Sequence, residues 1–104
     1  MLRLCSLFLS VFCLTGCASG PPVQEMSDAR QAIAAASTAG ATPSTSPDLY
    51  AAQAAIARAE SHLEAKEYVR ARLAAQEAKR HATAALNSAQ RADGAAPNAP
   101  PVPQ

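Results

Sequence analysis

The stretch that decides the fold is residues 47–86, PDLYAAQAAIARAESHLEAKEYVRARLAAQEAKRHATAAL, because two apolar stripes run through it. In each stripe the apolar positions recur in steps of three and four, which is the spacing of one helix face. The first stripe consists of Leu49, Ala52, Ile56, Ala59 and Leu63. The second consists of Tyr68, Ala71, Ala75, Ala78, Ala82, Ala85 and Ala89. They predict two amphipathic helices, over about 47–65 and 67–92.

The two stripes differ in phase. Seven residues beyond Leu63 the first stripe would reach Arg70, whereas the second runs through Ala71. We therefore expect a turn at 65–67, which would bring the stripes face to face in an antiparallel hairpin. Because this turn contains neither Gly nor Pro, one long and mostly exposed helix remains the alternative.

Two further expectations follow from the predicted hairpin. Symmetry about Lys66 would place Glu60 near Arg72, and Tyr68 would fill the turn end of the hairpin. The alanine stripe opposite Leu and Ile would allow the two helices to approach closely.

A shorter helix is predicted before the hairpin, over about 24–39. Its apolar stripe is Met26, Ala29, Ile33 and Ala36. Gly40 and Pro43 would end it. Ser46 is suited to cap the next helix, with Pro47 in the first helical position. The predicted fold class is all-α, a three-helix, alanine-rich body over 25–92.

The N-terminal residues 1–16 are typical of a secretory signal peptide. One positive charge at Arg3 precedes the apolar run 4–14, which is too short to cross a bilayer as a permanent helix. The run ends in a four-residue pattern that resembles the lipobox of bacterial lipoproteins. That pattern is Leu14, Thr15, Gly16 and Cys17. A buried cysteine in a short membrane helix is the alternative.

The lipobox resemblance implies that the Cys17 thiol receives a diacylglyceryl group and that the chain is cut before it. Cys5 and Cys13 would leave with the signal peptide, so no disulfide is expected. Residues 17–24 would be the lipidated cysteine and a short tether. In enteric lipoproteins an Asp after the cysteine marks the inner membrane. Ala18 and Ser19 stand here, which favours the periplasmic face of the outer membrane.

Composition excludes several kinds of function. The formal net charge of +1 gives no basic surface for nucleic acid. His62 and His81 are far apart in the predicted hairpin, which argues against a metal site. Glu60 and Glu64 share a helix face and are best explained as solvated charges. We predict no catalytic residue, no cofactor and no small-molecule substrate, and therefore a protein that is not an enzyme.

Two stretches, 26–36 (MSDARQAIAAA) and 47–86, resemble the alanine-rich bacterial lipoproteins of the domain-of-unknown-function family DUF4398. Members of that family often carry Gly at the second turn, where this chain has Lys66 and Glu67. The EYVRARLAAQEA element, 67–78, is similar to the second helix of a tetratricopeptide-type pair, a unit that usually binds other proteins. The tail, 93–104, is proline-rich and predicted to be disordered.

The expected role is therefore a non-catalytic interaction module or envelope-assembly accessory, with an envelope protein or a second copy as partner. The alternative is a self-associating coiled-coil lipoprotein similar to the small murein lipoprotein. A covalent wall link of the murein type uses a C-terminal lysine, whereas this chain ends in Pro103 and Gln104. A thin alanine core also predicts marginal stability of the isolated chain.

Overall fold

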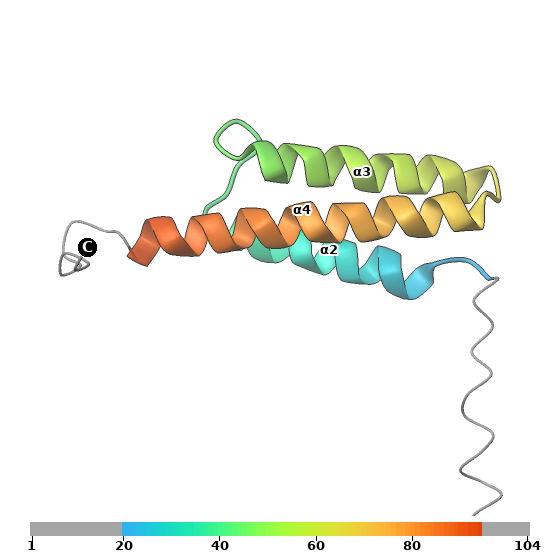
Figure 1. Cartoon of the computed structure of the whole chain (residues 1–104), viewed down its shortest axis with the longest axis horizontal. Coiled ribbons are helices and arrows are strands. Elements are labelled where there is room, and N and C mark those ends of the chain that lie inside the picture. Colours follow the sequence, from blue (N-terminus) through green and yellow to red (C-terminus); the bar gives the residue numbers. More distant parts are fainter. Residues whose placement is uncertain (1–19, 95–104) are drawn as a thin grey trace, which may run out of the picture.

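A computed structural model describes residues 20–94, which fold into three α-helices (Figure 1). Helix α2 spans Val23–Thr38, α3 spans Pro47–Glu64 and α4 spans Tyr68–Gly94. Residues 20–94 contain no strand, and the predicted all-α class is confirmed. The predicted signal peptide, Cys17 and most of the predicted tail lie outside the described residues. Helix α4 runs on to Gly94, past its expected end at about residue 92.

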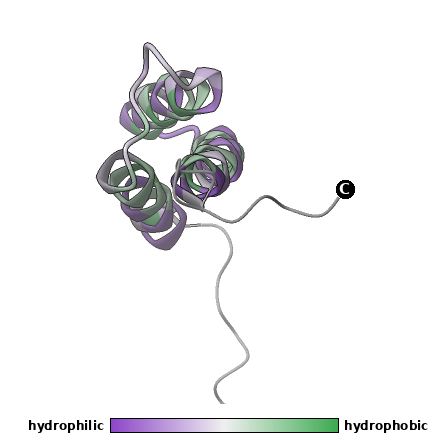
Figure 2. Cartoon of the chain, turned by 90° about the vertical axis from the view of Figure 1, so that its left-hand side faces the viewer, coloured by the Kyte–Doolittle hydropathy of each residue, from purple (hydrophilic) through white to green (hydrophobic). Residues whose placement is uncertain are grey.

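Helices α3 and α4 form the predicted antiparallel hairpin, and α2 lies alongside α4 (Figure 1). The alternative of one long helix is wrong. Viewed along their axes, the three helices form a triangle (Figure 2). Helices α2 and α4 begin at the same end of the bundle, beside the 65–67 turn. We call this the turn end, and the opposite end, which contains loop 39–46, the loop end.

Helices α2 and α3 are each followed by a residue whose backbone is in the left-handed region, with positive φ. Lys66 has φ 60°, and the amides of Lys66 and Glu67 donate to the carbonyls of Leu63 and His62. Gly40 has φ 104° and ends α2 with the same pair of hydrogen bonds, from Gly40 and the following residue. These two hydrogen bonds satisfy carbonyl groups that the end of a helix would otherwise leave unpaired. The hairpin turn is therefore closed by backbone geometry although it has no glycine.

The start of α3 follows the sequence expectation. The Ser46 hydroxyl accepts a hydrogen bond of 3.1 Å from the amide of Leu49, and Pro47 is the first helical residue. The helix begins here for two reasons. Ser46 has an extended backbone and caps the first turn, and Pro47 has no amide hydrogen at a position where the helix would not use one.

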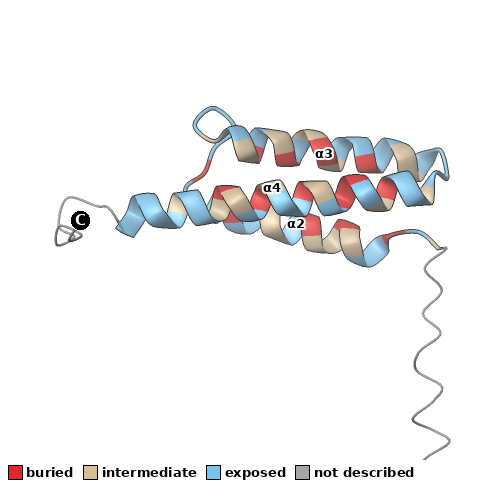
Figure 3. Cartoon of the chain, viewed as in Figure 1, coloured by how far each residue is buried: buried red, intermediate tan, exposed pale blue. Residues whose placement is uncertain are grey.

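The interior of the bundle is made mostly of alanine. The predicted stripes lie on the inner faces, where red marks buried positions in Figure 3. Buried members are Met26, Ala29, Ala36, Leu49, Ala52, Ala59, Ala71, Ala75, Ala78, Ala82 and Ala85, and half-buried members are Ile33, Ile56, Leu63, Tyr68 and Ala89. Ala55 and Ala74 are also buried and widen the stripes. Methyl side chains let the helices approach closely, but they remove little apolar area from water.

Helix α4 is longer than its two partners. It has 27 residues, against 16 in α2 and 18 in α3. Its last turns extend past the loop end, where residues 90–94 are exposed (Figure 3).

Candidate functional site

The segment that enters α2 is fixed to the body at the turn end. Arg72 on α4 donates from Nη2 to the carbonyl of Gly20 at 3.0 Å, and from Nε to Glu25 Oε1 at 3.0 Å. Pro22 is fully buried. Gly20, which this contact holds, lies three residues after Cys17 in the sequence. Cys17 and the rest of the predicted lipobox, residues 14–16, lie outside the described residues.

Ion pairs on the surface join each pair of helices. Arg30 on α2 meets Glu60 on α3 at 3.1 Å. Arg58 on α3 meets Glu77 on α4 at 3.0 Å. The expectation that Glu60 would pair with Arg72 was wrong, because α2 supplies the partners of both residues. About half of each side chain is exposed in these two pairs, so each contributes under about 1 kcal/mol and mainly sets the register of the helices.

Each histidine has a carboxylate neighbour on an adjacent turn or helix. His62 Nδ1 lies 3.3 Å from Glu67 Oε1 at the turn end. His81 Nδ1 lies 3.1 Å from Asp48 Oδ1 and joins α4 to the start of α3. Within residues 20–94 no cluster of three or more His, Cys, Asp or Glu side chains could hold a metal ion. The two imidazoles therefore tie structural elements together.

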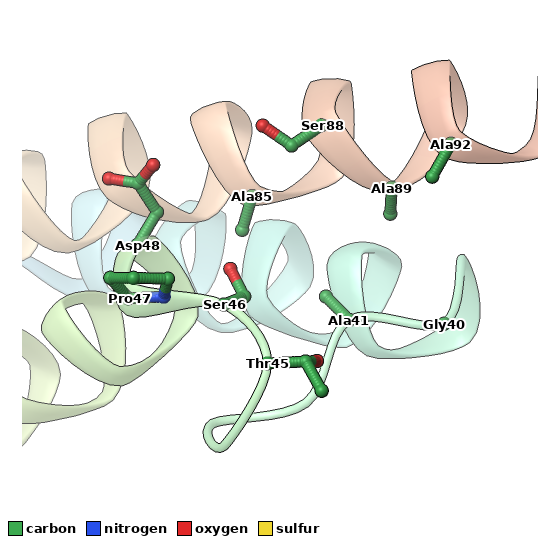
Figure 4. Close-up of a pocket in the computed structure, with 10 residues that line it drawn as sticks. All are labelled: Gly40, Ala41, Thr45, Ser46, Pro47, Asp48, Ala85, Ser88, Ala89 and Ala92. Carbon is green, nitrogen blue, oxygen red and sulfur yellow. The ribbon is translucent and has the colours of Figure 1, made fainter. Parts of the chain in front are cut away.

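An open groove lies at the loop end between α4 and the loop before α3 (Figure 4). Its volume is about 430 Å³. The methyl groups of Ala85 and Ala89 point from α4 toward the loop, and the Ser46 hydroxyl points toward α4. That hydroxyl already caps α3, and Asp48 already contacts His81. The groove is thus lined by small side chains, and its Ser46 and Asp48 side chains already contact other parts of the protein.

Four large hydrophobic side chains are exposed within the described part of the chain. Three of them lie at the turn end: Val23 in the first turn of α2, and Val69 and Leu73 in the first two turns of α4. Tyr50 lies near the loop end, in the first turn of α3. Tyr68, which was expected to fill the turn end of the hairpin, is half-buried next to the turn.

Comparison with known proteins gives one match. The family described as Domain of unknown function (DUF4398) matches residues 24–100. The chain belongs to the DUF4398 family. The DUF4398 match covers α3, α4 and all of α2 except its first residue. No curated protein and no solved structure matches the chain. Among residues 20–94, no helix of this DUF4398 member has the length and apolar character needed to span a membrane.

The sequence did not indicate the contact that fixes the tether of this DUF4398 chain. Arg72 follows Ala71 of the second stripe, and its partners lie 47 and 52 residues away on the entering segment. The only available signal was a long cation at the border of an apolar face, next to the turn that brings the three elements together.

Proposed function

We propose that this DUF4398 protein is a lipoprotein anchored by Cys17 to the periplasmic face of the outer membrane. The observation that carries the proposal is the Leu14–Cys17 sequence, placed directly after a charged start and a short apolar run. The Cys17 thiol would displace the phosphate headgroup of a phospholipid, which leaves with the thiol proton, and so form a thioether with its diacylglyceryl group. Hydrolysis of the Gly16–Cys17 peptide bond would then free the Cys17 amine, which could take an acyl chain from a second phospholipid that leaves as a lysophospholipid. Two or more chains hold a protein on a bilayer stably, whereas a single chain binds reversibly.

The role that we propose for the anchored body is non-catalytic, as an interaction module or envelope-assembly accessory. His81 and many of its charged side chains are engaged in contacts that join the helices, as with Arg58 and Glu77. A rigid helical body on a short anchor is suited to presenting a surface to another envelope protein. The similarity of 67–78 to a tetratricopeptide helix also favours a protein partner.

Self-association through the apolar stripes is the weaker candidate. Leu49, Ala59 and Ala75 are each fully buried within one chain. An oligomer like the small murein lipoprotein would need these same positions for contacts between chains, so the bundle would have to open first. An interaction through the outer surface avoids this cost.

Crosslinking in intact Gram-negative cells, followed by separation of inner and outer membranes, tests the proposal. We expect the protein in the outer-membrane fraction, with a crosslinked product that contains a second envelope protein. Products that contain only this chain would favour the self-associating alternative. Recovery in the soluble fraction would contradict the anchor itself.

A further inference from the structure

We infer that the turn end of the bundle rests against the phospholipid surface that holds the anchor, with Val69 and Leu73 at the contact. This inference rests on the proposed acylation of Cys17 and adds an orientation and a lipid contact to it. The surface concerned, which we call the basal patch, comprises seven exposed residues at the turn end: Val23, Glu64, Lys66, Glu67, Val69, Arg70 and Leu73.

The length of the tether is the first argument. Gly20 is held to α4 by the hydrogen bond from Arg72, and only three residue steps separate Gly20 from Cys17. Three extended residues span about 10–11 Å. This is about the diameter of one helix with its side chains. An acylated Cys17 would therefore keep the turn end within about one helix diameter of the lipid headgroups.

The apolar character of the patch is the second argument. Val23 is 72% exposed, Val69 67% and Leu73 59%. Val69 and Leu73 are four residues apart and so lie next to each other on one face of α4. Arg72, which holds the tether, lies between them in sequence. The exposed large hydrophobic side chains of α4 are thus close to the residue that holds the segment leading to the proposed lipid.

The charges of the patch define the kind of lipid. Between residues 64 and 70 two cations, Lys66 and Arg70, are balanced by Glu64 and Glu67. Arg70 lies 3.3 Å from Glu67 and is largely exposed. The long stems of Lys66 and Arg70 can cover apolar surface while their charges stay in the headgroup region. Because the charges balance, the patch fits a zwitterionic phospholipid surface and needs no anionic lipid.

The loop end offers a matched control. Tyr50 is 66% exposed, nearly the same as Val69, but it lies at the far end of α3. The 14 residue steps of α3 from Tyr50 to Glu64 place it about 21 Å away along the bundle. Asn87 is exposed on the far part of α4 and gives a second control on the same helix as Val69.

The chain contains no tryptophan, so single tryptophans can report on each position. Val69→Trp, Tyr50→Trp and Asn87→Trp are expressed as full chains in a Gram-negative host and purified from its membranes. Mass spectrometry of the N-terminal peptide determines whether Cys17 is acylated. Each protein is then reconstituted into phosphatidylcholine–phosphatidylethanolamine vesicles, with or without brominated acyl chains, which quench nearby tryptophan. Circular dichroism checks that each variant keeps its helices.

We expect severalfold stronger quenching by the brominated lipids at position 69 than at positions 50 and 87. Equal and weak quenching at all three positions in an acylated protein would overturn the lipid contact and leave the anchor proposal standing. A blue shift at position 69 without bromine quenching would mean that a second protein copy covers the patch, and would also overturn it. A protein that carries no lipid on Cys17 would overturn the anchor and this inference together.

Discussion

Arg72 and Gly20 are joined by a hydrogen bond of 3.0 Å from the Arg72 guanidinium to the Gly20 carbonyl. The same guanidinium contacts Glu25 at the start of α2, and only 20% of the Arg72 side chain is exposed. One side chain on α4 thus holds both the first turn of α2 and the segment before it. This makes the turn end a defined starting point for the tether that leads to Cys17.

Replacing Arg72 should therefore loosen the start of α2. We expect Arg72→Ala to lower the free energy of unfolding by about 1–2 kcal/mol, because charge-assisted hydrogen bonds in a partly shielded setting are lost. Hydrogen exchange at the amides of residues 23–26 should also become faster. Urea denaturation and exchange mass spectrometry measure the two effects.

Arg30→Ala is the matched control for Arg72→Ala. The Arg30–Glu60 pair is about half exposed, so its loss should change the free energy of unfolding by less than about 1 kcal/mol. Equal effects of the two substitutions on stability and on exchange at residues 23–26 would show that Arg72 has no special part in fixing the tether.

The two left-handed residues should respond in opposite directions to substitution. Lys66→Gly should stabilise the hairpin by about 1 kcal/mol, because a residue with a side chain is strained at φ 60°. Gly40→Ala should destabilise by a similar amount, about 1 kcal/mol, although a methyl group there meets no atom within 4 Å. The cost at Gly40 would then come from the backbone alone.

Gly94→Ala is the control for these turn substitutions, since Gly94 has open space around it and no positive φ. Its melting temperature should stay close to that of the parent. If Lys66→Gly lowers the melting temperature instead, the left-handed turn at 65–67 is not the conformation that closes the hairpin.

Enlarging a side chain in the alanine core should lower the stability of the protein. Ala55 is fully buried in one cluster with Ala29 and Ala78, where the three helices meet. Ala55→Leu should destabilise by about 1–3 kcal/mol, because added methylenes force the helices apart. Ala57→Leu, on the exposed side of the same helix, should stay within about 0.5 kcal/mol of the parent. Similar thermal melts for both variants would mean that the helices do not pack closely at Ala55.

The sequence predicted the helices and their inner faces well because apolar spacing and capping are local. Ser46 caps α3 and Pro47 is its first residue, as the sequence predicted. The sequence indicated the turn less clearly, because Lys66 takes a left-handed conformation that its residue type does not favour.

The pairing of Glu60 with Arg72 failed for a reason that is not local. Symmetry within a two-helix hairpin ignores the third helix, and α2 supplies Arg30 to Glu60 and Glu25 to Arg72. The site at the turn end depends on that third helix, so it became visible only from the arrangement of all three. The lipobox prediction lies outside the described residues and depends on the sequence pattern alone.

Metabolic labelling with a palmitate analogue tests the central claim most directly. The parent chain should incorporate label and lose residues 1–16, so that Cys17 becomes the modified N-terminus. Cys17→Ser should incorporate none and accumulate as the uncleaved precursor, because serine lacks the thiol that forms the thioether. A Cys17→Ser protein that is still labelled and cleaved after Gly16, or a parent chain without label, would contradict the account.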